Sequence, residues 1–421
     1  MEIGPYIKLH RVKQEMTQAD LAEGIVSFAY LSKIENGKTE ASPEVISLLC
    51  TRLGIQLDNE KDITIKNKCQ EWYSQLFEVN DKEEIVRGYK ELEELMETTH
   101  SESMVLYEIH KIRYFLVLGK YEDALEQINN LAEISSTFDS LHQFYWYKFK
   151  GNYYSLTGEF NQAIRMYGLA EDKLNQLELA EEEVADLQYT VSVTHSKLRN
   201  TLESIEYANK ALDVFQRQYH FLRCAQCHIM LGISYRRIKM YDKAIKNHNL
   251  AKHLGKLNHS KQIMQLVNQN LGYLHSAKGD TEEAIHFYEQ VADDNDVSLI
   301  ERIAATTSLI KEYYNIDNLD QTRNMIEKSL QLLGSSYKND EYKLFYYIIH
   351  TYDYALKQEN DKFEALVTNE FIPYLKKNKD FANLVTYSTM IASYYEENYR
   401  YKDAVKYYKL ANITYDELVN I

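Results

Sequence analysis

The segment GEFNQAIRMYGLA, residues 158–170, decides the fold because its spacing recurs along most of the chain. A turn residue is followed by an aromatic residue two positions later, a small residue three further on, an aromatic residue four beyond that, and another small residue three later. These positions are Gly158, Phe160, Ala163, Tyr167 and Ala170. Residues three or four apart share one face of a helix, so small residues let a neighbouring helix approach while rings fill the gaps.

Four other segments carry this spacing, with some apolar residues in place of the aromatic and small ones. They are Gly119, Tyr121, Ala124, Ile128 and Leu131; Lys239, Tyr241, Ala244, His248 and Ala251; Gly279, Thr281, Ala284, Tyr288 and Val291; and Tyr399, Tyr401, Ala404, Tyr408 and Ala411. Twelve positions before the central small residue, three copies have a further small residue, at Gly151, Gly232 and Gly272. The pattern is typical of stacked helical hairpins, and we expect these glycines to let paired helices approach closely.

The central residue of each copy serves as an anchor, and successive anchors are 38 to 43 residues apart. The anchors are Ile85, Ala124, Ala163, Ser204, Ala244, Ala284, Thr322, Ala365 and Ala404. The copies near Thr322 and Ala365 are degenerate. Because only 14 Gly and 3 Pro interrupt the chain, helix is expected nearly throughout. The sequence predicts an all-α fold, with a right-handed α-solenoid of about nine tetratricopeptide-like repeats over residues 66–421 and a linker at 58–65.

Residues 1–57 follow a different pattern, that of a small helical domain. Helices are expected at 3–13, at 18–23 with Thr17 as N-cap, from Ser27 to Glu35, and from Ser42-Pro43 onward. Gly24 and Asn36-Gly37 end the second and third helices. The residues expected in its core are Ile7, Val12, Leu21, Ala22, Ile25, Leu31, Ile34, Ile46, Leu49 and Leu53. Two short helices joined by a tight turn and buttressed by others can lay one helix in a DNA major groove.

The charge is unevenly distributed between the two parts. The whole chain carries −15, whereas residues 1–57 hold six Lys and Arg against seven Asp and Glu, which leaves about −1 for the head. Since phosphate neutralisation by Lys and Arg supplies most non-specific DNA affinity, a single neutral head should bind DNA weakly.

The head resembles the Cro and phage-repressor type of helix-turn-helix in the runs TQADLA, residues 17–22, and LSKIENGK, residues 31–38, with Ser42-Pro43 following. This resemblance implies that the start and end of the helix pair contact phosphate and that the third helix faces the groove. The DNA-contact candidates are Gln18, Ser27, Phe28, Ala29, Tyr30, Lys33, Asn36 and Lys38. Phe28 and Tyr30 stand where hydrogen-bonding side chains are common. The alternative is a head that has lost DNA binding and merely packs on the repeats.

The repeats offer candidate ligand contacts on their alternating helices, which would line the concave surface. Spacing of i, i+3, i+4 and i+7 selects Arg113, Tyr145, Lys148, Asn152, Tyr189, Gln226, Arg236, Gln269, Asn270 and Tyr273. Amides such as Asn152 and Asn270 can clamp a peptide backbone, and a cation such as Arg113, Lys148 or Arg236 can meet a carboxylate. The alternative is a solvated inner face without a dedicated ligand.

No constellation indicates catalysis, a metal or a cofactor. Cys224 and Cys227 have the spacing of a metal pair, but a second pair is lacking, so buried free thiols are expected. Histidines fall singly, and there is no HExxH, Gly-rich phosphate loop or nucleophile elbow. The chain also lacks a hydrophobic signal and a run of eighteen apolar residues. A cytoplasmic non-enzyme is therefore expected.

The combination of a Cro-type head with about nine such repeats resembles the peptide-pheromone receptors of Gram-positive bacteria, the Rap, NprR, PlcR and PrgX group. Repeat number and chain length are most similar to the NprR type. The resemblance implies a quorum-sensing transcription regulator that binds a short signalling peptide in its repeats and operator DNA through its head, as a homodimer or higher oligomer. The alternative is an adaptor whose repeats sequester a sporulation response regulator and inhibit phosphotransfer.

Overall fold

The computed structural model describes residues 3–54, 59–78, 82–98 and 103–419. Within these ranges the regular structure is helical, without a β-strand. Residues 1–195 and 196–421 form two compact units, and each is treated separately below.

The head contains the four helices expected from the sequence. They are α1 (Ile3–Lys13), α2 (Gln18–Ala22), α3 (Phe28–Glu35) and α4 (Pro43–Arg52). The predicted N-caps are confirmed, because the side chains of Thr17, Ser27 and Ser42 accept hydrogen bonds from the backbone of the first turns. Ile7, Leu21, Ala22, Leu31, Ile34, Leu49 and Leu53 form the buried cluster, with Ile25 packed against it. Val12 and Ile46, also expected in this core, are only half-buried.

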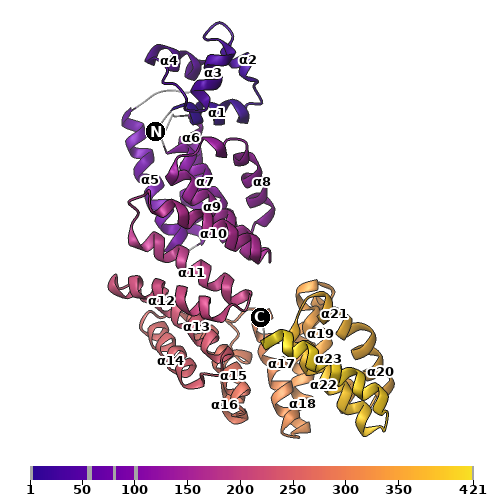
Figure 1. The fold of residues 1–421 in the computed structure, drawn as a ribbon. Coiled ribbons are helices and arrows are strands. Elements are labelled where there is room, and N and C mark those ends of the chain that lie inside the picture. The colour runs from indigo at the N-terminus through magenta and orange to yellow at the C-terminus, as the bar shows by residue number, and fades with distance from the viewer. Residues whose placement is uncertain (1–2, 55–58, 79–81, 99–102, 420–421) are drawn as a thin grey trace. The chain divides into compact units, whose positions relative to one another are not determined.

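The rest of the first unit is a series of hairpins stacked in chain order (Figure 1). They consist of α5 (Asn59–Glu78) with α6 (Lys82–Thr98), α7 (Met104–Val117) with α8 (Tyr121–Ala132), and α9 (Ser140–Leu156) with α10 (Phe160–Leu174), followed by α11 (Glu181–Lys197). Residues 59–65, expected as part of a linker, already belong to α5, and residues 55–58 lie outside the described residues.

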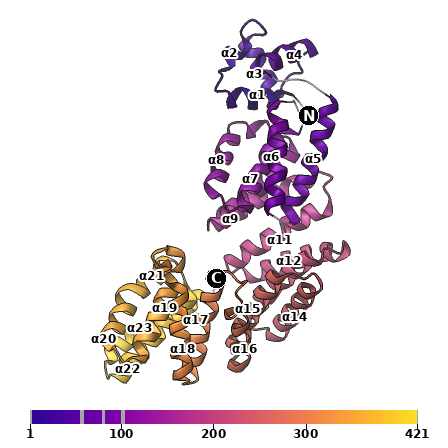
Figure 2. The same ribbon diagram turned by 180° about the vertical axis from the view of Figure 1, so that it is seen from behind.

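The second unit is itself built from antiparallel helices that follow one another in the chain (Figure 2). Its helices are α12 (Thr201–Arg217), α13 (Phe221–Arg237), α14 (Tyr241–Leu257), α15 (Lys261–Lys278), α16 (Thr281–Ala292), α17 (Leu299–Asn315), α18 (Leu319–Leu333), α19 (Lys343–Leu356), α20 (Asn360–Ala365), α21 (Ile372–Lys377), α22 (Phe381–Glu397) and α23 (Tyr401–Val419). Counting α20 and α21 as one interrupted helix, the described helices from α5 onward form nine consecutive pairs along the sequence, the number of repeats that the sequence predicts.

The predicted close approach at glycines is confirmed in three hairpins. A Cβ atom added to Gly151 would lie 2.4 Å from the ring of Tyr167, and one added to Gly272 would lie 2.4 Å from the ring of Tyr288. At Gly232 the corresponding ring is that of His248, at 2.5 Å. The glycine of the first helix therefore receives the ring that stands four residues after the anchor on the second helix.

One predicted anchor is in the wrong register. The other anchors occupy the fourth position of the second helix in their hairpins, where they are buried, but Ala365 is exposed at the end of α20. The fourth position of α20 is Phe363, which is 3% exposed. The repeat is present, but its anchor is displaced by two residues from the predicted one because a large ring occupies the position where the pattern requires a small residue. A π-helical segment, Leu366–Phe371, follows directly, and Pro373, which has no N–H for an i→i−4 bond, stands just beyond it.

Candidate functional site

The surface of α3 that was predicted to face DNA is open to solvent. Ser27, Phe28, Ala29 and Lys33 are exposed, as is Lys38 beyond the helix, and Phe28 has 58% of its surface accessible. Ser27 caps the helix by accepting from the backbone N–H of Tyr30, whose own hydroxyl donates to the carbonyl of Glu40. Such a large exposed ring beside a lysine suits contact with base edges and sugars more than packing.

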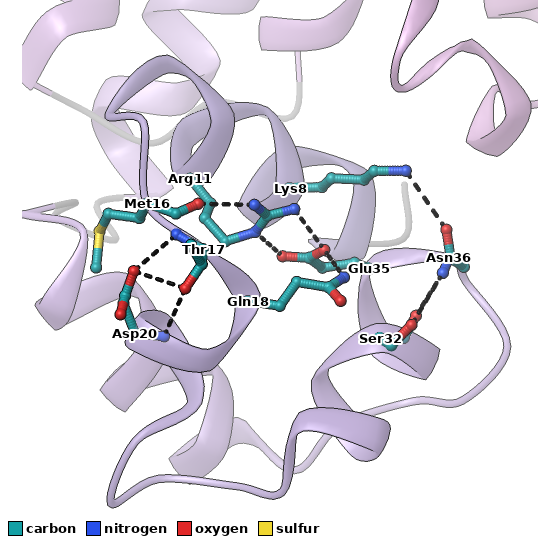
Figure 3. A network of polar contacts seen from close by, with 9 residues as sticks. All are labelled: Lys8, Arg11, Met16, Thr17, Gln18, Asp20, Ser32, Glu35 and Asn36. Carbon is teal, nitrogen blue, oxygen red and sulfur yellow. Dashed lines mark hydrogen bonds and ion pairs between the residues drawn. The ribbon is translucent and has the colours of Figure 1, made fainter.

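A buried ion pair joins the three helices that hold this surface (Figure 3). Glu35 has no exposed surface, and its carboxylate accepts from Arg11 Nε at 2.6 Å and Arg11 Nη2 at 3.0 Å. Gln18 Nε2 donates to the same carboxylate at 2.5 Å. Because a buried charge is tolerated only when paired and hydrogen-bonded, this network sets the positions of α1, α2 and α3 relative to one another.

Two of the predicted phosphate contacts therefore use part of their hydrogen-bonding capacity inside the head. The amide nitrogen of Gln18 is engaged with Glu35. Asn36 Nδ2 donates to the carbonyl of Ser32 at 2.6 Å, and Asn36 Oδ1 lies 3.5 Å from Lys8 Nζ (Figure 3). The sequence does not predict the pairing of Arg11 with Glu35, because its only sign in the sequence is that the two residues have opposite charges on different helices.

The head is anchored to the second repeat by another buried carboxylate. Glu108 of α7, which is 2% exposed, accepts from Lys13 of α1 at 2.5 Å and from Gln127 Nε2 at 2.7 Å, and Lys111 Nζ lies 3.4 Å away. Burial opposes ionisation of this group, but the charges of Lys13 and Lys111 outweigh it and lower the pKa of Glu108. In Figure 1 and Figure 2, α1 lies on the side of the head next to α7.

In the first unit, one predicted ligand contact has a structural role. Lys148 is completely buried, and its ammonium group lies 2.9 Å from Asp186 Oδ2, 3.0 Å from Glu183 Oε2 and 3.3 Å from the carbonyl of Glu183. It also lies 4.8 Å from the ring centroid of Phe77. Since an ammonium group has three N–H donors, Lys148 has none left for a peptide carboxylate. Helical spacing could not reveal these partners on α11.

The remaining candidates of this unit surround Lys148 and the Gly151–Tyr167 contact. Arg113 is half-buried, donates to the carbonyl of Leu76 and lies 5.9 Å from the ring of Phe77. Tyr145 is buried against His110 and Phe149, and Tyr189 is half-buried. Asn152 is 4% exposed: its Oδ1 accepts from the hydroxyl of Tyr167 at 3.0 Å, and its Nδ2 has no partner within the described residues.

The candidates of the second unit come from α13 and α15. Gln226 accepts from Arg223, and Asn270 donates to the carbonyl of Leu266, so both are partly satisfied locally. Arg236 has a shielded Nε, and Gln269 has a shielded Oε1 and Nε2, none of which finds a hydrogen-bond partner in the described chain. Tyr273, one turn after Gln269, is 37% exposed and lies 5.7 Å from the ring of Tyr288. Buried polar groups are nearly always paired, so these atoms mark a surface suited to a polar ligand.

The four cysteines are free and buried, which includes Cys224 and Cys227, for which the sequence predicts burial. Burial raises the pKa of the Cys224 thiol to about 11. In the part of the chain that is described, no group of three or more His, Cys, Asp or Glu side chains is placed to hold a metal ion. No described helix is long and apolar enough to cross a membrane.

Comparison with known proteins matches both parts of the chain. Residues 7–59 match the family model described as "Helix-turn-helix", and residues 145–371 match the model described as "Soluble NSF attachment protein, SNAP". The transcriptional activator NprA of Geobacillus stearothermophilus is 33% identical over 409 residues, which cover 95% of this chain and 100% of NprA. The response regulator aspartate phosphatase I of Bacillus subtilis is 22% identical over 85% of this chain and 93% of its own length.

Two solved structures share the fold at low sequence identity. The apo form of the quorum sensor NprR from B. thuringiensis aligns with a TM-score of 0.70 at 18% identity, over 85% of this chain and 99% of that chain. A Rap protein complexed with competence and sporulation factor gives the same TM-score, identity and coverage.

The head, the repeats and these matches define the class of protein, a helix-turn-helix transcription regulator with helical repeats. The chain belongs to the family of the transcriptional activator NprA, and its repeats belong to the family described by the SNAP model. This membership confirms the resemblance to the Rap and NprR group. It also agrees with the expectation of a protein that is not an enzyme.

Proposed function

We propose that this regulator binds a short signalling peptide through the first helices of its repeats and operator DNA through α3, and that the peptide controls DNA binding. The observation that carries the proposal is a set of shielded polar atoms on Arg236 and Gln269 of the second unit, which find no hydrogen-bond partner in the described part of the chain. A peptide backbone offers both donors and acceptors, and a carboxylate offers acceptors, so a peptide can satisfy these atoms. Structures of the NprR protein in complex with the peptide NprX and of a Rap protein with competence and sporulation factor support a peptide as the ligand.

The DNA-binding part of the proposal rests on exposed residues of the head, namely Phe28, Ala29, Lys33 and Lys38. Gln18, Ser27, Tyr30 and Asn36 would add contacts with the atoms that their internal hydrogen bonds leave free. Because the head is nearly neutral, we propose that two heads act together in a homo-oligomer, on half-sites about 34–36 Å apart. Peptide binding would shift the oligomer between head spacings that do and do not match the operator.

The test begins with the selection of operator fragments from genomic DNA by the full-length protein. Replacing Phe28, Tyr30 and Lys33 together by alanine should abolish this selection, whereas alanine at Lys68 of α5, which pairs with Glu91, should leave it unchanged. Titration of short peptides by calorimetry, followed by repetition of the DNA measurement, then tests the coupling. If a bound peptide changed neither the oligomeric state nor the operator affinity, the proposed control would be wrong.

A second candidate function is capture of a sporulation response regulator by the repeats. It is favoured by the similarity to the response regulator aspartate phosphatase I over 85% of this chain. The triple alanine variant of the head separates the two functions, because it should lose operator binding while it retains a protein captured by the repeats. Full retention of operator binding by this variant would instead contradict the assignment of α3.

A further inference from the structure

The second unit brings together three arginines from two neighbouring turns. Arg199 follows α11, and Arg236 and Arg237 end α13. Arg237 Nη1 donates to the carbonyl of Ser196, and to Ser196 Oγ at 3.1 Å, so the end of α13 is tied to a residue three positions before Arg199. The charge of Arg199 acts on both Arg236 and Arg237, so we call the three residues the arginine cluster.

No carboxylate of the described residues forms an ion pair with the arginine cluster, although the chain has 63 Asp and Glu against 48 Lys and Arg. Burial lowers the pKa of Arg199, and the charge of Asp380, which forms no ion pair with it, only partly offsets this effect. The oxygens of Asp380 accept from the backbone and side chain of Asn383. Burial, then the charges of Arg199 and Arg236, lower the pKa of Arg237 to about 10. The cluster thus holds half-buried positive charge that no described carboxylate neutralises by an ion pair, and Asp380 offsets only part of the charge of Arg199.

Neutral hydrogen-bonding groups surround Arg236. Burial lowers the pKa of Arg236, and the hydroxyl groups of Tyr288 and Tyr273 act in the opposite direction. Gln269 lies one turn before Tyr273 on α15, and its shielded amide has no hydrogen-bond partner in the described chain. The His248 ring, packed on Gly232 one turn before Arg236, has a pKa lowered to about 3 by burial and by Arg236, so it stays neutral at physiological pH. The surroundings of Arg236 therefore supply donors and acceptors without a negative charge.

A guanidinium group that is shielded from water and lacks a counter-ion is costly, and its natural partner is a carboxylate held by parallel N–H donors. Clusters of strongly perturbed groups also occur preferentially at binding sites. Of the three arginines in the cluster, the sequence predicts a carboxylate contact only for Arg236. Arg199 lies in a turn, where helical spacing makes no prediction.

We propose that the arginine cluster is an anion site and that the peptide bound by the repeats is acidic, with a carboxylate held by Arg236 and Arg199 and its backbone by the Gln269 amide. This inference rests on the proposed function, since it specifies the chemistry of that ligand. The carboxylate can come from an Asp or Glu side chain or from the peptide's C-terminus.

The experiment presents the full-length protein with a pool of short synthetic peptides in which Asp and Asn, and free and amidated C-termini, are equally frequent. Peptides retained after rapid gel filtration are identified by mass spectrometry. We expect peptides with Asp or a free C-terminus to be enriched about tenfold over their neutral counterparts. Comparing the two kinds of substitution distinguishes a side-chain carboxylate from a terminal one.

Variants assign this preference to the cluster. Arg236→Gln should remove the enrichment, Arg236→Lys should retain most of it, and Arg199→Gln should weaken it, which keeps the test informative if one variant folds poorly. Arg323→Gln is the matched control, because Arg323 is an exposed arginine of the same unit that pairs with Asp320. This control should behave like the unchanged protein.

Each outcome has a defined meaning. Retained peptides without acidic enrichment, or with the same enrichment in Arg236→Gln, would overturn the inference while leaving the proposed function intact. Failure to retain any peptide would contradict the proposed function itself. Titration with inorganic phosphate forms a separate arm: stabilisation by phosphate that is lost in Arg236→Gln, without any acidic peptide being enriched, would show a phosphate site and overturn the acidic peptide.

Discussion

At the scale of single residues, glycines have opposite roles that depend only on what lies beside them. Gly151 of α9 faces the ring of Tyr167, whereas Gly168 of α10 has no neighbouring atom within 4 Å of the position of a Cβ. Both lie inside helices, where glycine is a poor helix former. Helix propensity therefore favours alanine at both positions, and close packing forbids it at one.

We predict that Gly151→Ala destabilises the protein by about 1–3 kcal/mol because the added methyl group must displace the Tyr167 ring. Gly168→Ala, the matched control, should stabilise it by up to about 1 kcal/mol. Urea unfolding followed by circular dichroism measures both changes. Equal effects of the two substitutions would contradict the packing argument.

A single buried histidine makes stability depend on pH. His110 is 1% exposed, its Nδ1 donates to the carbonyl of Leu106, and its ring stacks on Tyr73 at 3.8 Å between centroids. Burial lowers the pKa of His110 from 6.5 to about 3. Between these values the unfolded chain binds a proton that the folded protein does not, so the stabilising contribution is complete above pH 6.5 and is lost as pH falls.

We predict that His110→Phe has a flatter dependence of unfolding free energy on pH between 7.5 and 5. The unchanged protein should lose about 2 kcal/mol more than the variant over this interval, by linkage. The difference between the two proteins at pH 7.5 provides the baseline for any packing effect. Parallel curves would show that folding does not lower the pKa of His110.

At the scale of helices, α1 is shared between the head and the repeats. Ile7 belongs to the core of the head, while Lys13 at the end of the same helix reaches Glu108 of α7. Since α7 also carries Arg113, one helix joins the anchoring point of the head to a candidate ligand contact. The ion pair thus connects the head, which we propose binds DNA, with the helix that carries a candidate peptide contact.

We predict that Lys13→Ala destabilises the protein by about 1–2 kcal/mol, because Glu108 stays buried with only Lys111 as a cation, while the partial exposure of Lys13 limits the loss. Lys68→Ala removes the exposed pair with Glu91 and serves as the control, with a change of about 0.5 kcal/mol or less. Chemical denaturation measures both, and hydrogen exchange in α1 should rise only in the first variant. Unchanged exchange there would contradict an anchoring role.

At the scale of the whole molecule, the distribution of charge governs association with DNA. The chain carries −15, of which only about −1 lies in residues 1–57 by the count of six Lys and Arg against seven Asp and Glu. Since like charges repel, we expect the acidic repeats to oppose DNA binding and a small number of exposed cations in the head, Lys33 and Lys38 among them, to supply the phosphate contacts.

We predict that Lys33→Ala reduces the slope of log affinity against log salt concentration by about 1 for each head bound. Fluorescence anisotropy with a selected operator fragment, repeated over a range of salt concentrations, measures the slope. Lys68→Ala should leave it unchanged. An unaltered slope in Lys33→Ala would mean that Lys33 contacts neither phosphate nor base.

The sequence predicted the local structure because local signals determine it. Thr17, Ser27 and Ser42-Pro43 marked the helix starts of the head, and the recurring anchors marked nine successive pairs of helices along the sequence. The one register error, Ala365 instead of Phe363, arose where a large ring replaced the small residue that the pattern required. For the candidate peptide contacts, helical spacing indicated which residues share one face of a helix, but not which side chains of other helices they contact. Lys148 therefore proved to be a buried ion-pair residue.

Periodicity and capping by themselves determined the class of fold, the number of hairpins and the helix-turn-helix head, since each depends on residues a few positions apart. Only the tertiary structure decided which charges are neutralised and which are not. Lys148 pairs with Asp186 on another helix, whereas the shielded Nε of Arg236 has no hydrogen-bond partner among the described residues. The physical reason is that electrostatic pairing depends on distance in space, which the spacing of residues along one helix does not contain.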